Sequence, residues 1–180
     1  MNVKDTQLKE PSMFKIDFKK ALWNFMIVLA IFLTDRFFKI YILKIAQLEN
    51  TVDIYLTQYL NFYLIWNKGI AFCMFSFEDS FIYNIITTII IVITTIVLAM
   101  IIKNKGFKKY SLLFVFGGSL GNLFDRIYYS AVPDFIDIHI NNFHWFIFNV
   151  ADIFITFGVI CLIYSEIFNK NDENENEKNI

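Results

Sequence analysis

The chain is poor in charge, in cysteine and in the residues that break regular structure. Of its 180 residues, 18% are charged, and there are two cysteines, two prolines and six glycines. Two cysteines exclude a disulfide-built scaffold, and so little charge, Pro and Gly excludes a disordered chain. Sixteen basic residues against seventeen acidic ones leave no basic excess, which argues against a nucleic-acid partner.

Apolar residues are abundant instead. They make up 57% of the chain, with 22 Phe among them, whereas a soluble domain has about 45–50% apolar and roughly 25% charged residues. A soluble domain of this size could not cover so much apolar surface. We therefore expect an all-α membrane protein with the lipid bilayer as its partner, helical because lipid offers no water to exposed backbone groups.

The charge-free run at 81–102 is long enough to cross a hydrocarbon core of ~30 Å. Three further spans, interrupted by polar residues, are expected at 21–43, 110–128 and 143–168, which makes 21–168 one four-helix domain. Residues 1–20 are expected to be a cytoplasmic segment, and 169–180 a disordered cytoplasmic tail. A cleaved signal peptide at 1–34 is disfavoured, because Asp35 and Arg36 follow it instead of small residues.

Lysine placement predicts the orientation. Lysines gather before the first span and between the second and third, at 4, 9, 15, 19, 20, 103, 105, 108 and 109. The loops at 47–80 and 129–142 hold only Lys68, so both termini are expected in the cytoplasm and these loops outside. The runs VDIYLTQ and LNFYLIW in the first loop predict a small extracytoplasmic β-sheet on the outer surface.

Three carboxylates are predicted to share one layer of the membrane. A helical rise of 1.5 Å per residue places Asp35 about 21 Å, Asp125 about 22 Å and Asp152 about 17 Å from the inner face. Within the spans, the spacing lets Asp35 pair with Lys39. It also places Asn122 on the same helix side as Asp125 and Arg126, and it points Asn149 and Asp152 in the same direction. Intramembrane charges usually face the bundle interior and mark function, although such groups can also simply hold helices together.

Two acids remain after the cations are assigned. If Lys39 and Arg126 pair with Asp35 and Asp125, then Asp134 and Asp152 have no obvious cation. Two carboxylates brought together at low dielectric share one proton. One can then deprotonate a water while the other protonates a carbonyl oxygen, which is the chemistry of aspartic proteolysis.

Other chemistries are less well supported. His139 and His144 match no zinc-helix pattern and are expected to be structural, Cys73 and Cys161 are expected to be packing residues, and neither a metal nor a cofactor is expected. Ser119 lies in GGSLG, but a nucleophile elbow needs a strand-turn-helix setting, so these glycines are expected to let helices approach closely. A proton or ion pathway and a membrane scaffold remain as rival functions.

Five blocks in the chain resemble lipoprotein signal peptidase, the type II signal peptidase family of bacteria. They are Asp35-x-x-x-Lys39, the NKGIAF block at 67–72, GGSLGNLFDR at 117–126, VPDF at 132–135 and FNVAD at 148–152. The resemblance covers residues 21–168 and departs from the family pattern at Phe38, Cys73 and Pro133.

The resemblance implies an intramembrane aspartic endopeptidase. It would remove signal peptides from diacylglyceryl-modified prolipoproteins by cutting before the lipidated cysteine, in the bacterial inner membrane and near its outer face. Nothing in the sequence requires more than a monomer. Asp134 and Asp152 match the catalytic pair. The matching substrate-binding or supporting positions are Asp35, Lys39, Asn67, Gly69, Asn122, Asp125, Arg126 and Asn149.

Overall fold

The computed structural model describes residues 17–69, 80–141 and 143–178, and these form four helices and one four-stranded sheet. Predictions for residues 1–16, 70–79 (with Cys73) and 179–180 lie outside these ranges. In chain order, the elements are α1 (Phe18–Glu49), β1 (Asp53–Thr57), β2 (Leu60–Asn67), α2 (Ser80–Lys103), α3 (Gly106–Tyr129), β3 (Val132–Ile140), β4 (Phe143–Phe148) and α4 (Val150–Lys178).

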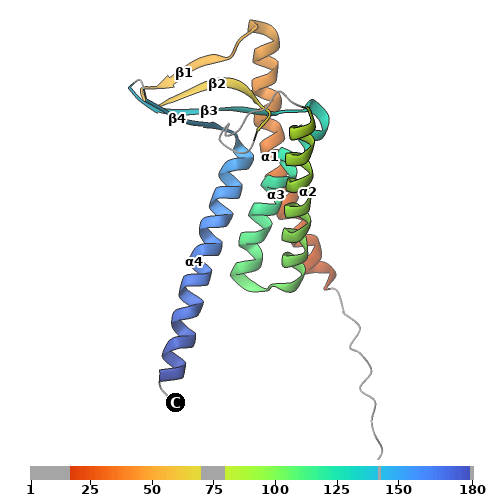
Figure 1. Ribbon diagram of the computed structural model, residues 1–180, viewed down its shortest axis with the longest axis vertical. Coiled ribbons are helices and arrows are strands. Elements are labelled where there is room, and N and C mark those ends of the chain that lie inside the picture. The colour runs from red at the N-terminus through yellow and green to blue at the C-terminus, as the bar shows by residue number, and fades with distance from the viewer. Residues whose placement is uncertain (1–16, 70–79, 142, 179–180) are drawn as a thin grey trace, which may run out of the picture.

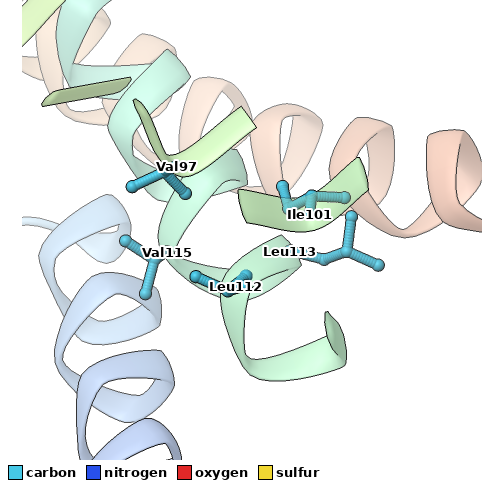
Figure 2. Packing of buried hydrophobic residues seen from close by; sticks show 5 residues of the cluster. All are labelled: Val97, Ile101, Leu112, Leu113 and Val115. Carbon is cyan, nitrogen blue, oxygen red and sulfur yellow. The ribbon is translucent and has the colours of Figure 1, made fainter. Parts of the chain in front are cut away.

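Helix α3 is the centre of the helical layer and packs against α1, α2 and α4. Its contact with α2 is a cluster of buried aliphatic side chains, Val97, Ile101, Leu112, Leu113 and Val115 (Figure 2). The α2 bounds agree with the predicted span at 81–102, because an uninterrupted apolar run leaves little doubt about where the helix lies.

The sheet is antiparallel, with strand order β1-β2-β3-β4. It lies across one end of the helices, beside the last turns of α1 and above the start of α4 (Figure 1). Phe135 of β3 is fully buried and packs with Ile42, Val52 and Val150. This apolar contact fixes β3 against the beginning of α4.

The predicted small sheet is present, but it is larger than the sequence indicated. Strands β1 and β2 fall within the predicted outer loop at 47–80, whereas β3 and β4 lie in segments that were expected to be a loop and the start of a helix. The aromatic and β-branched run FHWFIF of β4 suits a strand, and it pairs with β3.

The predicted fourth helix at 143–168 is therefore wrong at both ends. The helix begins at Val150, because residues 143–148 pair as a strand. It continues to Lys178, and the disorder expected for the tail at 169–180 stays a prediction. Extending a formed helix needs no new nucleus.

Among the residues that the structure describes, two helical segments are long and apolar enough to cross a membrane, Phe81–Lys103 and Val150–Phe168. Helix α1 contains Asp35, Arg36 and Lys39, and α3 contains Asp125 and Arg126. These charges lower the hydropathy of both helices, so composition alone establishes only two of the four predicted spans.

Candidate active site

Asn149 and Asp152 hold each other at the start of α4. The backbone N–H of Asp152 donates to Asn149 Oδ1 at 3.1 Å, and the backbone N–H of Asn149 donates to Asp152 Oδ2 at 3.2 Å. This reciprocal pair is a capping box, which satisfies two otherwise orphaned N–H groups. The predicted proximity of these two side chains is confirmed. The expected place of Asp152 well inside a span is wrong, because α4 starts at Val150.

Asp134 reaches the same place from β3. Its fully buried carboxylate accepts hydrogen bonds from Asn149 Nδ2 at 2.6 Å and from Asn67 Nδ2 at 2.8 Å. Asn149 therefore contacts Asp134 through its side-chain amide and Asp152 through both its amide oxygen and its backbone. Two acids from separate segments are therefore both hydrogen-bonded to Asn149.

The surroundings of Asp134 favour its protonated form. Burial raises the pKa of Asp134 from 3.8 to about 7, and the negative charge of Asp152 adds to this rise. The amide donors of Asn149 and Asn67 and the charge of Lys39 act in the opposite direction. Because the raising effects prevail, Asp134 keeps a proton up to neutral pH.

Four charged side chains form a neutral cluster between α1 and α3. Lys39 Nζ lies 3.0 Å from Asp35 Oδ2 and 2.6 Å from Asp125 Oδ2. Arg36 bridges the same two carboxylates, at 2.8 Å to Asp35 and 2.5 Å to Asp125. All four side chains are at least nine-tenths buried. The predicted Asp35–Lys39 pair is confirmed, and each acid has two cations.

This cluster is connected to the acid pair by two routes. Lys39 Nζ donates to Asn122 Oδ1 at 3.0 Å, and Asn122 Nδ2 donates to Asp152 Oδ1 at 2.8 Å. Asp35 Oδ1 accepts from the backbone N–H of Ala151 at 3.0 Å. Helices α1, α3 and α4 thus meet at this point, and the polar residues predicted to share a layer are brought together.

Glycines on α3 permit this close approach. A Cβ at Gly121 would lie 2.7 Å from Asp35 Oδ2, and one at Gly118 would lie 2.5 Å from the carbonyl oxygen of Ala151. The interpretation of GGSLG as a helix-packing motif is confirmed. Ser119 lies within α3 and not at a strand-to-helix turn, so the setting of a nucleophile elbow is absent there.

Arg126 does not pair with Asp125, so that predicted pair is wrong. The cations of α1 already hold Asp125, and Arg126 Nη2 donates instead to the Gly69 carbonyl oxygen. The Gly69 N–H donates to Asn67 Oδ1 at 2.8 Å, so this loop also positions Asn67. Within the part of the chain that the structure describes, Arg126 Nε and Nη1 are buried and have no hydrogen-bond partner.

A cavity of about 190 Å³ lies in front of the two acids. Asp134, Asp152 and Arg126 line its polar side, and Ile90 and Ile93 of α2 contribute to its apolar wall. Such a site can hold an apolar extended segment and a water molecule next to two carboxyl groups. That geometry suits hydrolysis of a peptide bond.

Two contributors did not emerge as site residues from the sequence. The sequence pattern assigned Arg36 no role in the site, although Arg36 holds both Asp35 and Asp125. Tyr83 of α2 donates its hydroxyl to the Arg126 carbonyl oxygen at 2.9 Å. A charge next to Asp35 in an apolar helix was a usable signal for Arg36, whereas nothing in the local sequence marks Tyr83.

His139 and His144, which were expected to be structural, lie opposite each other on β3 and β4. Their rings are 5.1 Å apart, and Asp137 lies beside them. Among the described residues, these three side chains form a group that could hold a metal ion. Cys161 is a partly exposed free thiol in α4.

A protein-family model described as signal peptidase (SPase) II matches residues 27–168. The chain is 53% identical to a lipoprotein signal peptidase of Pelagibacter ubique (strain HTCC1062), over 93% of this chain and all of the relative. It is 36% identical to one of Francisella tularensis subsp. novicida, covering 84% and 96% of the two chains, and 32% identical to one of Anaplasma phagocytophilum, covering 87% and 99%.

Two solved structures share the fold, and both are described as bacterial membrane enzymes. One superposes with a TM-score of 0.65 at 24% identity, over 83% of this chain and 90% of the other. The second has a TM-score of 0.59 at 26% identity, over 79% and 90%.

Proposed function

We propose that this chain, which belongs to the signal peptidase (SPase) II family, removes signal peptides from prolipoproteins with Asp134 and Asp152 as its catalytic pair. The observation that carries the proposal is the hydrogen bonding of both carboxyl groups to Asn149, beside a cavity that they both line. The substrate class follows from the family, and we extend it to precursors cut just before a diacylglyceryl-modified cysteine.

The two acids have distinct tasks in this mechanism. Asp134, with its pKa raised to about 7, protonates the scissile carbonyl oxygen. Asp152 takes a proton from the attacking water, whose oxygen bonds to the carbonyl carbon. In the collapse of the tetrahedral intermediate, the C–N bond breaks, Asp152 gives its proton to the leaving amine, and Asp134 recovers its own.

The supporting residues hold this pair and the substrate. Asn122 and Asn149 orient Asp152, and Asn67 and Asn149 orient Asp134. Arg126, whose buried Nε and Nη1 have no partner within the described residues, donates to a substrate carbonyl. The neutral cluster of Asp35, Arg36, Lys39 and Asp125 braces the helices and takes no part in proton transfer.

The chain acts as a four-span protein of the inner membrane, with both termini in the cytoplasm and the sheet outside. Helix α1 supports this arrangement, since Leu33 and Phe37 are more than half exposed while Asp35 and Lys39 are fully buried. An apolar exterior around buried charges is typical of a membrane helix. The start of α1, the α2–α3 connection and the end of α4 also lie opposite the sheet (Figure 1).

The signal helix enters sideways from the bilayer, along the apolar wall formed by Ile90 and Ile93. Its acyl chains stay in lipid, and the cleavage point reaches the acids near the outer surface, where water is available. A monomer contains every group that this reaction needs.

The test is cleavage of a diacylglyceryl-modified precursor peptide by the purified protein in mixed micelles, with the shortened lipopeptide measured by mass spectrometry. We expect Asp134→Asn and Asp152→Asn each to abolish turnover while thermal unfolding stays cooperative. Asp53→Asn, an exposed carboxylate of β1, is the matched control and keeps full activity. Turnover by either catalytic variant refutes the assignment of the catalytic pair. If the wild-type protein yields no shortened lipopeptide, the result favours the rival functions, a proton or ion pathway or a membrane scaffold.

A further inference from the structure

A second group of titratable side chains lies in the sheet, outside the proposed active site. His139 of β3 is paired with His144 of β4, and Asp137 lies two residues before His139 on the same strand face. The strand pairing is irregular between Asp137 and His139. These residues therefore converge on one spot of the β3–β4 hairpin.

The distances within this group match a metal-ligand set. His144 Nδ1 is 2.8 Å and His139 Nδ1 is 3.8 Å from the same oxygen of Asp137, Oδ2. One ligand atom from each of the three residues lies within 4.8 Å of the other two. Bond lengths of about 2.0–2.2 Å in a tetrahedral zinc site place neighbouring ligand atoms roughly 3.3 Å apart, which is between the two observed separations.

Several polar atoms of this group are buried and unsatisfied. Asp137 and His139 are 3% and 8% exposed, and within the described ranges Asp137 Oδ1 and His139 Nδ1 have no hydrogen-bond partner. Asn61 of β2, paired directly with Asp137, also has a buried unsatisfied Oδ1. Each such group costs about 1–3 kcal/mol, and a bound cation would satisfy them together.

We propose that Asp137, His139 and His144 bind a divalent transition metal ion of the zinc type. Two imidazoles and one carboxylate favour Zn²⁺ over Mg²⁺ or Ca²⁺, which prefer all-oxygen ligands. Asn61, which pairs with Asp137 across the strands and has a buried amide oxygen without a partner in the described residues, is the candidate for a fourth ligand. His144 has more than half of its side chain exposed, and this gives the ion a route from solvent.

The metal fastens β3 to β4. This hairpin connects Asp134 to Asn149 and Asp152, so the ion stabilises the segment that sets the distance between the two acids. It takes no part in the hydrolysis, and the proposal stands whether or not the chain is a peptidase.

The test measures metal binding directly. The full-length protein without a histidine tag is stripped with EDTA in detergent and titrated calorimetrically with Zn²⁺, and separately with Mg²⁺. We expect one Zn²⁺ per chain and no Mg²⁺ binding. Loss of a residue that only hydrogen-bonds to a metal ligand typically lowers metal affinity about 10–100-fold. Asp137→Asn and His144→Gln each alter a ligand itself, so they should weaken Zn²⁺ binding about 100-fold or more. Asp53→Asn should leave it unchanged.

A rescue variant separates loss of a ligand from loss of the fold. His144→Cys supplies a thiolate where the imidazole was, so it should restore tight Zn²⁺ binding and give Co²⁺ a sulfur-to-metal charge-transfer band that the wild type lacks. Zn²⁺ should also raise the Tm of the wild type and not that of Asp137→Asn. Wild-type protein that binds no Zn²⁺, or binds it no more tightly than Asp137→Asn does, overturns the proposal.

Discussion

Asn149 performs two tasks that substitution can separate. Its Oδ1 caps α4 by accepting the Asp152 N–H, and its Nδ2 donates to Asp134. Asn149→Ser keeps an oxygen that can cap the helix and removes the donor to Asp134, whereas Asn149→Ala removes both. We predict that the serine variant loses activity while it keeps most of its stability, and that the alanine variant loses both.

The magnitudes follow from the two bonds. A hydrogen bond to a charged group contributes about 1.5–3 kcal/mol, so its full loss lowers turnover by roughly 10–150-fold at about 1.4 kcal/mol per factor of ten. Loss of an N-cap costs typically about 1 kcal/mol of folding stability. Asn149→Ala should therefore unfold about 1 kcal/mol more easily than Asn149→Ser.

The pH profile gives a signature that a purely structural effect would not produce. The pKa of Asp134 is raised to about 7, so wild-type turnover should fall as pH rises through about 7, when the pair loses its shared proton. The Asn149 amide opposes this rise in pKa. Removing it makes Asp134 a weaker acid, so in Asn149→Ser turnover falls and its alkaline limb moves to higher pH.

The assay is cleavage of the lipidated precursor across a pH series on both sides of neutrality, with thermal unfolding of the same samples. Asp152 of α4 and Lys39 of α1 are the charged groups that also act on Asp134, and both are unchanged in these variants. An alkaline limb that stays in place or moves to lower pH in Asn149→Ser contradicts the assigned role of the amide. Equal stability of the serine and alanine variants contradicts its role as a cap.

Two further predictions concern the neutral cluster. Lys39→Met leaves Asp35 and Asp125 buried with one cation fewer, so it should lower the free energy of unfolding by about 3 kcal/mol. The control Lys108→Met, which breaks a partly exposed ion pair, should lower it by at most about 1 kcal/mol. Equal losses of the two variants in chemical unfolding would contradict the argument that burial makes the Lys39 ion pairs stronger. Gly121→Ala places a Cβ 2.7 Å from Asp35 Oδ2 and should lower the free energy of unfolding by about 1–3 kcal/mol. An unchanged Tm would contradict the close packing of α1 against α3 at this glycine.

The sequence was most informative where one local property decides the outcome. The charge-free run at 81–102 predicted α2 to within two residues, and the i, i+4 spacing predicted the Asp35–Lys39 pair. Expensive intramembrane charges must find partners, so their convergence could also be anticipated. Because an unpaired charge in an apolar setting is energetically costly, the pairing of such residues can be predicted from the sequence.

It was least informative where long-range pairing decides. Strand β4 is an apolar aromatic run that could equally begin a membrane helix, and its pairing with β3 settles the matter. The partner of Arg126 was wrong for a similar reason, since two cations of α1 occupy Asp125 and the Gly69 carbonyl is free to accept. Which of several cations pairs with a given carboxylate depends on the assembled site and cannot be predicted from local spacing.

The charge balance of the site supports the proposal that the acid pair holds one shared proton. Lys39 and Arg36 pair with Asp35 and Asp125. The cluster therefore has no net charge with which to neutralise a further carboxylate. Asp152 accepts the backbone N–H of Asn149 at the positive end of α4, where a negative charge is favoured. Asp134 lies in a strand that offers no such end, so in the proposed mechanism the shared proton is placed on Asp134. Under that mechanism, the helix cap sets the direction of proton transfer: Asp152 takes a proton from water and Asp134 donates one to the carbonyl oxygen.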